Sequence, residues 1–206
     1  MKRTIVLFNI LLLSICLSAT NLSFSGGKSS LSLKEGKEEV ILSDGAVVNL
    51  DDMTIKGERI VLSGTDWRYV RCEGSTLVTD TSRGLEIRAV DILYDRENET
   101  LSIGSWFEVN DTKEEITAMG GSMYFNMDSE VLELNQQVSL LKITDKGIME
   151  CFAESMIYDR NNSTLSLRSG ANVKWDGDEY KAEAISVNLE DDSIKLEGRI
   201  KGTING

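Results

Sequence analysis

Acidic side chains are the groups in this sequence that could do chemistry, because it contains 34 Asp and Glu residues and no His. The absence of His excludes the usual catalytic triads and imidazole acid–base arrangements. The pairs Asp51-Asp52 and Asp191-Asp192 could bind ions, but both lie where turns are expected, and Asp favours turns. Asp176-Gly177-Asp178-Glu179 offers too few ligands in too short a span for a calcium loop. We therefore expect no catalytic residue, no metal site and no cofactor.

Two cysteines, Cys72 and Cys151, lie beyond the N-terminal apolar segment and could form a metal site or a disulfide. Two thiolates without a His cannot complete a tetrahedral zinc site. An exported compartment permits a disulfide, so pairing of the two cysteines is left open. Cys151 also falls on a core position of the repeat described below, which favours a small buried side chain there.

The N-terminus has the layout of a secretory signal peptide. Lys2 and Arg3 precede an apolar run over residues 5–17, and small and polar residues follow. This run is shorter than the roughly 20 residues that span a bilayer. An uncleaved inner-membrane anchor and a lipoprotein modified at Cys16 remain as alternatives.

These features predict three segments. We expect residues 1–25 to be a cleaved signal peptide, residues 26–39 a flexible lead-in, and residues 40–206 one domain with a sizeable core. The predicted location is the periplasm, with an inner-membrane anchored form as the alternative.

The exported part is strongly acidic. Removing Lys2 and Arg3 leaves 20 basic residues (22 − 2) against 34 acidic ones, a net charge of −14. Such a surface opposes binding to nucleic acid and to anionic lipid headgroups, because nothing neutralises their phosphates. The acidic residues recur in turns and on alternate strand positions, which favours solvated faces.

The chain repeats a short motif at a regular spacing. The segment that begins with Tyr94-Asp95-Arg96 recurs 64 residues later, from Tyr158-Asp159-Arg160, and Phe125 lies midway, 31 residues after Tyr94. A period of about 31 residues marks stacked supersecondary units, each too small to bury its own apolar face.

Apolar residues alternate along each unit, but the alternation changes parity in the middle of the strand. Three-residue steps replace two-residue steps from Ala89 to Ile92, from Gly120 to Met123, and from Ala153 to Met156. A side chain stays on the inner face through such a step only where the strand bends or bulges. We therefore expect an all-β fold of stacked, bent antiparallel strands joined by polar hairpin turns.

Two regions stand apart from the regular units. Residues 57–83 depart from the period and are expected to form an additional bent hairpin. The last expected strand, residues 194–204, carries Ile194, Leu196 and Ile200 and has no capping element after it. An uncapped edge can accept a strand from a neighbour, so we expect these residues to mediate head-to-tail association.

The repeated units resemble the OstA/LptA-like family of periplasmic domains in lipopolysaccharide export. The resemblance covers roughly residues 40–205 and consists of an apolar-x-Ala start, a bend, an apolar-x-Tyr-Asp end, a polar turn and Thr-Leu-x-aliphatic. The pattern occurs twice: Ile87-Arg88-Ala89 is followed by Tyr94, and Cys151-Phe152-Ala153 is followed by Tyr158. The chain departs from the pattern at residues 57–83 and at Gly120-Gly121. The resemblance implies an open β-jellyroll, or "β-taco".

The same resemblance implies a function and partners. It implies a bridge that shields the acyl chains of lipopolysaccharide or a related glycolipid between the inner and outer membranes. The implied partners are an LptC-like inner-membrane anchor, an LptD-like outer-membrane barrel and further copies of the chain, and the chain is more similar to LptA than to LptC. The interior residues expected to contact lipid are Ile87, Ile92, Met123, Phe125, Met156, Tyr158 and Leu167.

Two interpretations stay open at this point. The interior is either a lipid-accessible groove or an ordinary packed core, because small residues among the apolar ones fit both. The alternative function is that of a structural or protein-binding β-solenoid of the cell envelope without lipid cargo.

Overall fold

The computed structural model describes residues 22–34 and 37–204, and over this part the chain consists of strands and turns with one short 3-10 helix. The elements are β1 (Leu22–Ser25), β2 (Lys28–Lys34), β3 (Lys37–Leu50), β4 (Met53–Ser63), η1 (Thr65–Trp67), β5 (Tyr69–Asp80), β6 (Leu85–Asp95), β7 (Thr100–Ile103), β8 (Phe107–Asp111), β9 (Ile116–Gly120), β10 (Ser122–Asn126), β11 (Val131–Thr144), β12 (Gly147–Asp159), β13 (Thr164–Trp175), β14 (Asp178–Asn188), β15 (Ile194–Glu197) and β16 (Lys201–Thr203).

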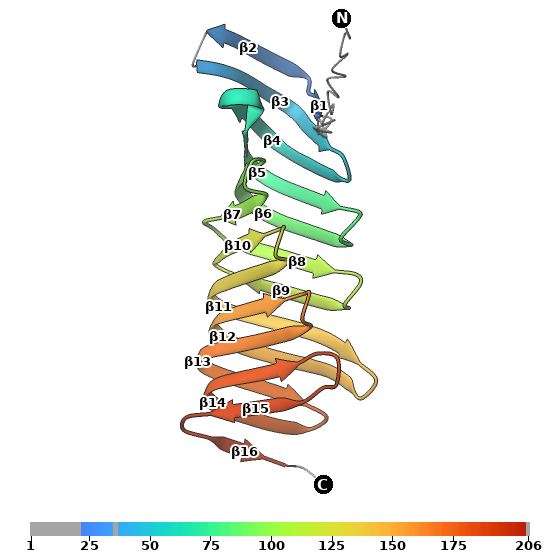
Figure 1. The fold of residues 1–206 in the computed structure, drawn as a ribbon, viewed down its shortest axis with the longest axis vertical. Helices are drawn as coiled ribbons and strands as arrows, with labels where there is room; N and C mark the ends of the chain where they lie inside the picture. Colours follow the sequence, from blue (N-terminus) through green and yellow to red (C-terminus); the bar gives the residue numbers. More distant parts are fainter. Residues whose placement is uncertain (1–21, 35–36, 205–206) are drawn as a thin grey trace, which may run out of the picture.

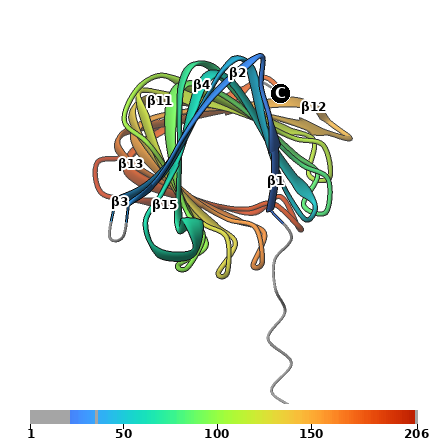
Figure 2. The ribbon, with the colours of Figure 1, turned by 90° about the horizontal axis from the view of Figure 1, so that it is seen from above.

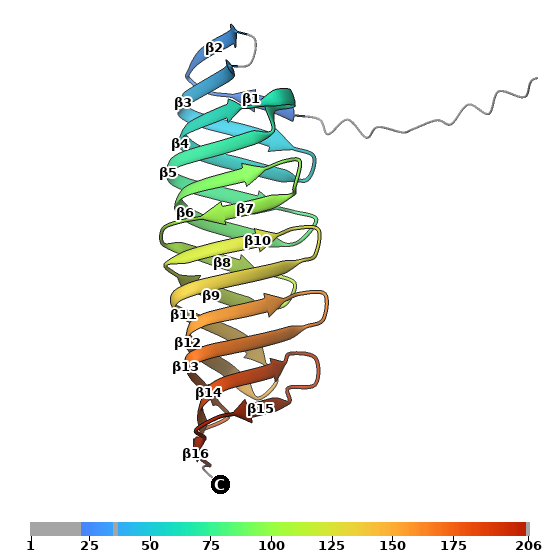
Figure 3. The same cartoon turned by 60° about the vertical axis from the view of Figure 1, so that its left-hand side comes forward.

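All described strands belong to one antiparallel sheet that follows the order of the chain. Successive strands stack as rungs along the long axis, from β1 and β2 at one end to β15 and β16 at the other (Figures 1 and 3). Viewed down that axis the rungs superpose into a ring (Figure 2). The prediction of an all-β fold of stacked, bent antiparallel strands is confirmed.

Alternate strands, such as β12, bend where the sequence pattern changes parity, and the strands between them, such as β11, bend at a four-residue step between inward residues. At one bend Gln136 and Gln137 of β11 together oppose the single residue Glu154 of β12, and both glutamines have positive φ. This two-against-one arrangement is a β-bulge, which turns the strand and lets the next side chain face inward again. Ala153 and Met156, on either side of Glu154, are accordingly both buried.

The bends divide every rung into two halves, so the sheet forms two facing walls. The first wall ends in the turns 51–52, 81–84, 112–115, 145–146 and 176–177, and the second wall in the turns 64–68, 96–99, 127–130, 160–163 and 189–193. Neighbouring turns of one wall are joined by backbone hydrogen bonds, such as Thr112 N to Gly84 O at 2.9 Å and Arg160 N to Glu130 O at 3.1 Å. We call the line along which the two rows of turns face each other the seam.

One continuous apolar core fills the space between the walls and runs from β3 to β14. Its largest fully buried side chains include Tyr158, Phe107 and Phe125. Since each rung contributes residues from both halves, the core is shared by consecutive rungs, as expected for stacked units.

The N-terminal boundaries differ from those expected. The expected flexible lead-in, residues 26–39, contains β2, which pairs along its whole length with residues 37–43 of β3. Leu22–Ser25, expected to be removed with the signal peptide, forms β1 and pairs with Val47 to Leu50 of β3. Residues 1–21 lie outside the described part, so the signal peptide itself stays a prediction. The expected hairpin over 57–83 lies in β4, η1 and β5.

Gly57 offers a test of how tightly the bends are packed. A Cβ atom at this position would lie 2.1 Å from the Cys72 sulfur across the β4–β5 ladder. We predict that Gly57→Ala lowers the free energy of unfolding by about 1–3 kcal/mol, the usual cost of overpacking. In a Cys72→Ala background most of this loss should disappear, because the clashing sulfur is gone. Additive losses in a urea-unfolding double-mutant cycle would show that the bend tolerates the methyl group.

Candidate functional site

The interior residues predicted from the sequence all lie in the core. None of Ile87, Ile92, Met123, Phe125, Met156, Tyr158 and Leu167 is more than 3% exposed. In the second wall they form ladders along the axis: Leu134 pairs with both Met123 and Met156, and Leu132 pairs with both Phe125 and Tyr158. Their contact with lipid stays a prediction.

The interior side chains are closed off from solvent. Side chains with so little accessible surface touch neither solvent nor an internal void that admits water. From the side, these ladders become accessible only if the two walls move apart at the seam, where no backbone ladder among the described strands joins the walls.

The seam is closed at mid-length by charged residues that the sequence analysis did not predict, together with the predicted interior residue Tyr158. We call Asp80, Arg83, Asp111, Glu130, Tyr158 and Arg160 the seam cluster. Asp111, fully buried at the end of β8, accepts a hydrogen bond from the Tyr158 hydroxyl at 3.0 Å and from Arg160 Nε at 2.7 Å. Because Asp111 belongs to the first wall and the other two residues to the second, both bonds cross the seam.

A second group of bonds crosses the seam beside Asp111. Arg83, in a turn of the first wall, donates to Glu130 Oε1 at 2.6 Å and to the Met127 carbonyl at 3.1 Å. Arg160 donates back to the Arg83 carbonyl at 2.8 Å and forms an ion pair with Glu130. Each of the two arginines thus belongs to one wall and donates hydrogen bonds to the other.

Electrostatics favour the ionised forms of Asp80 and Arg160 and the neutral form of Tyr158. Burial alone disfavours the Asp80 carboxylate, yet hydrogen bonds from Arg83 N–H, the Ser82 hydroxyl and the Arg83 guanidinium lower its pKa below the ordinary value. Burial likewise opposes the charge of Arg160, but the bond to Asp111 and the nearby carboxylates raise its pKa. Burial and the Asp111 charge raise the pKa of Tyr158, which keeps its hydroxyl a donor.

A repeated sequence signal marks the first-wall side of the cluster. Asp80-Thr81 and Asp111-Thr112 lie 31 residues apart (111 − 80), at the ends of β5 and β8. Asp80 and Asp111 each accept backbone N–H bonds within the following turn, at 2.9 Å from Arg83 and 3.1 Å from Lys113. The signal was available in the sequence, but the period alone does not say which turns face each other.

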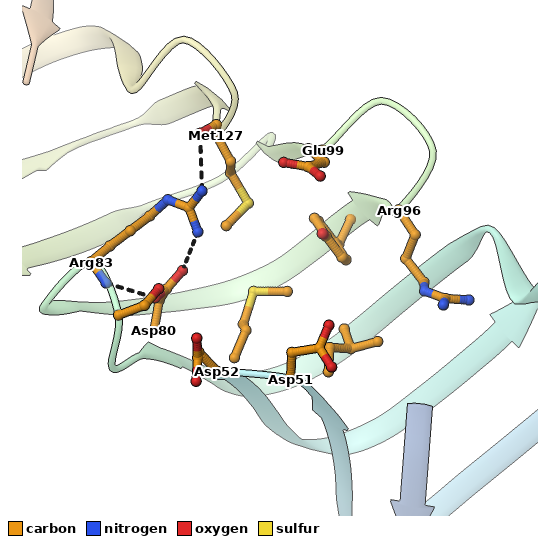
Figure 4. Close-up of a pocket in the computed structure, with 11 residues that line it drawn as sticks. Asp51, Asp52, Asp80, Arg83, Arg96, Glu99 and Met127 are labelled. Carbon is orange, nitrogen blue, oxygen red and sulfur yellow. Dashed lines mark hydrogen bonds and ion pairs between the residues drawn. The ribbon is translucent and has the colours of Figure 1, made fainter. Parts of the chain in front are cut away.

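A cavity of about 220 Å³ lies beside the cluster, toward the N-terminal end of the seam. We call it the seam pocket. It opens between the first-wall turn at Asp51 and Asp52 and the second-wall turn at Arg96 and Glu99, with Arg83 at its border (Figure 4). Apolar side chains of the core also line it: Leu50, Met53, Tyr94 and Met127.

The two ends of the stacked sheet leave apolar residues uncovered. Ile194 and Leu196 of β15 are half-buried against the end of the core, and Ile200 is 55% exposed between β15 and β16. At the opposite end, Leu31 and Leu33 of β2 are 60% and 69% exposed. β2 has a ladder partner on one side only, β3.

The two cysteines are free and lie in opposite walls. Cys72 and Cys151 are both buried, and Cys151 occupies a core position as its place in the repeat predicts. Burial raises the pKa of Cys151 to about 12 and also raises that of Cys72, so neither thiol ionises at neutral pH.

Among residues 22–34 and 37–204, no group of three or more His, Cys, Asp and Glu side chains is arranged to hold a metal ion. Within the same ranges, no helix is long and apolar enough to cross a membrane.

The Tyr158 hydroxyl allows a direct measure of the seam bond. We predict that Tyr158→Phe lowers the free energy of unfolding by about 1–2 kcal/mol, because Asp111 loses a buried donor. Tyr124→Phe is the matched control, since Tyr124 lies on the outer face and is 40% exposed; it should change stability by less than about 0.5 kcal/mol. Equal effects in urea unfolding would mean that the Tyr158 bond contributes nothing to closure.

The ion pair of Arg68 and Asp95 predicts a specific acid dependence. The Arg68 guanidinium donates to Asp95 at 2.7 Å and lowers the pKa of that carboxyl from 3.8 to about 2. The stabilisation is therefore present above pH 3.8 and is lost as pH falls toward about 2. We predict that Asp95→Asn flattens the decline of the urea midpoint over this range. An unchanged slope would show that other carboxylates dominate acid unfolding.

No family model and no curated protein matches the chain. Among solved structures, it is similar to LptH of Pseudomonas aeruginosa, described as the LptA-homologous periplasmic component of the conserved lipopolysaccharide transport device. That match covers 91% of this chain and 96% of LptH, with 12% sequence identity and a TM-score of 0.30. A likeness at this level assigns the chain to no family, and the walls, the core and the seam are described from this chain alone.

Proposed function

We propose that the protein is a lipid-transport bridge of the periplasm, which shields acyl chains of lipopolysaccharide or a related glycolipid between the inner and outer membranes. One observation carries the proposal: an apolar interior runs the length of a folded-over sheet whose two end rungs leave apolar residues uncovered. The sequence resemblance to OstA/LptA-like domains supports the same function.

The transfer of acyl chains from one apolar environment to another needs a continuous apolar path. Each methylene group exposed to water costs about 0.8 kcal/mol, so a free acyl chain cannot cross an aqueous compartment at useful rates. Side chains along the inner ladders, such as Met123, Leu134 and Met156, replace water around the acyl chain once the walls part. The net charge of −14 after the signal peptide opposes the binding of phosphate groups, so we expect the headgroup to stay in solvent outside the seam.

The path becomes long enough only if several units join end to end. The edge strands β2 and β15 each have a free side on which a neighbouring strand can add, and Leu31, Leu33, Ile194, Leu196 and Ile200 lie at these ends. We propose that an LptC-like inner-membrane anchor and an LptD-like outer-membrane barrel join by the same strand addition. Heterologous joining of this kind need not close, so we expect open filaments of variable length.

The competing function is a structural or protein-binding β-solenoid without cargo. It shares the stacked strands and the uncovered ends, and it differs in predicting that the walls never part.

Lipid analysis of the natively purified protein decides between the two. We predict that mass spectrometry of a chloroform–methanol extract detects a multiply acylated glycolipid in a fixed ratio to protein, with no such enrichment for an unrelated exported protein prepared in parallel. A lipid-free protein that also takes up no glycolipid from membranes would contradict the transport function and favour the solenoid.

End-to-end association can be tested by placing a charged side chain at one end of the sheet. We predict that Ile200→Lys weakens concentration-dependent association, because it places a charge on the uncovered end of the core. Ile148→Lys is the matched control, as Ile148 is 59% exposed on the outer face of the first wall. Association should strengthen with ionic strength, since salt screens the repulsion between acidic units. Light scattering that shows a strict monomer at all concentrations would contradict the filament.

A further inference from the structure

The proposed function requires the two walls to part, and the bonds between side chains of the two walls lie along the seam. We propose that the seam cluster is a reversible closure that opens before an acyl chain enters the core, and that the opening begins at the seam pocket. This inference rests on the proposed lipid-transport function. It adds that the seam cluster controls the entry of the acyl chain into the core.

The bonds of the cluster are arranged to hold the two walls together. Arg83 reaches from the first wall to Glu130 and to the Met127 carbonyl of the second. Arg160 reaches from the second wall to Asp111 and to the Arg83 carbonyl of the first. Because the two guanidiniums bond in opposite directions and share Glu130, one wall cannot move without breaking bonds to both.

The chemistry of the cluster suits a closure that has to reopen. Asp111 is fully buried, and Arg160 and Glu130 have side chains only 9% and 18% exposed. When the walls part, these charges regain water, which offsets much of the lost ion-pair attraction. An apolar closure of the same size would instead expose apolar surface to water and would resist opening.

The other copy of the Tyr-Asp-Arg motif makes different bonds. Arg96 corresponds to Arg160, but its guanidinium donates to the Asp66 and Trp67 carbonyls, within its own wall. The walls are separated there by the seam pocket, whose lining includes the core residues Leu50, Met53 and Tyr94. The pocket is therefore the place where apolar interior comes nearest to solvent along this part of the seam.

The test uses a distance across the seam and a lipid probe in the same samples. Spin labels go on Lys113 and Asn161, which are exposed turn residues of the first and second wall. Cys16 is replaced by Ser, while the buried Cys72 and Cys151 stay in place, because thiols with raised pKa values label slowly. Double electron–electron resonance reports the distance, and a fluorescent C12 fatty acid reports uptake.

We predict that Arg160→Met lengthens the distance distribution and speeds fatty-acid uptake on the order of tenfold, the factor that corresponds to about 1.4 kcal/mol of closing free energy. Glu130→Gln, which keeps the side-chain shape, should give a smaller change in the same direction. Arg96→Met is the matched control and should leave the distance unchanged, since its bonds stay within one wall. Circular dichroism confirms that each variant is folded.

The outcomes separate this inference from the function on which it rests. Folded Arg160→Met and Glu130→Gln variants with wild-type distances and wild-type uptake would overturn the closure. Fast uptake by the wild type with the distance unchanged would overturn the claim that opening comes first. Longer distances with no fatty-acid binding by any form would instead overturn the proposed function and the role of the closure in cargo entry.

Discussion

A β-strand presents its side chains alternately on two faces, so a sheet that folds over on itself can enclose an apolar interior only if the regular two-residue alternation changes at each bend. In β12 the inward residues Ala153 and Met156 are three residues apart, and in β11 the inward residues Leu134 and Val138 are four apart. Bulges such as that at Gln136 and Gln137 opposite Glu154 meet this requirement, because they insert one residue on one side of the ladder. The walls, the continuous core and the facing rows of turns all follow from this repeated change. Without it, half of every rung would present its apolar residues to solvent.

The same geometry leaves the fold with one side that no backbone ladder closes. Along the seam the walls meet through turns, whose side chains are polar because turns need Asp, Asn and Ser. Closure therefore depends on side-chain bonds, and the chain supplies them from residues that already cap the turns. Asp111 illustrates the double use: one oxygen accepts turn N–H groups and the other accepts Tyr158 and Arg160.

More of the fold than of the candidate site could be predicted from the sequence. Periodicity and the three-residue steps predicted the bends at Ala89, Gly120 and Ala153, because alternation is a local property of one strand. β2 was missed because an edge rung buries no side chain, so Lys28–Lys34 lacks the apolar pattern of the inner rungs. The seam cluster was missed because its cross-seam bonds join residues 44 to 77 positions apart, a relation that depends on the stagger of the two walls. Tyr158 was predicted as an interior residue, but its hydroxyl also belongs to the seam.

The most direct test of the account asks whether cargo lies inside the walls. Phe125 and Tyr124 are neighbours in β10 that face opposite sides of the same wall, at 1% and 40% exposure. A photo-crosslinking benzoylphenylalanine at either position, activated in cells, reports what touches each face. Transport through the interior predicts a glycolipid adduct at position 125 and none at position 124. Adducts at both positions, or none at position 125 in a folded protein, would contradict it.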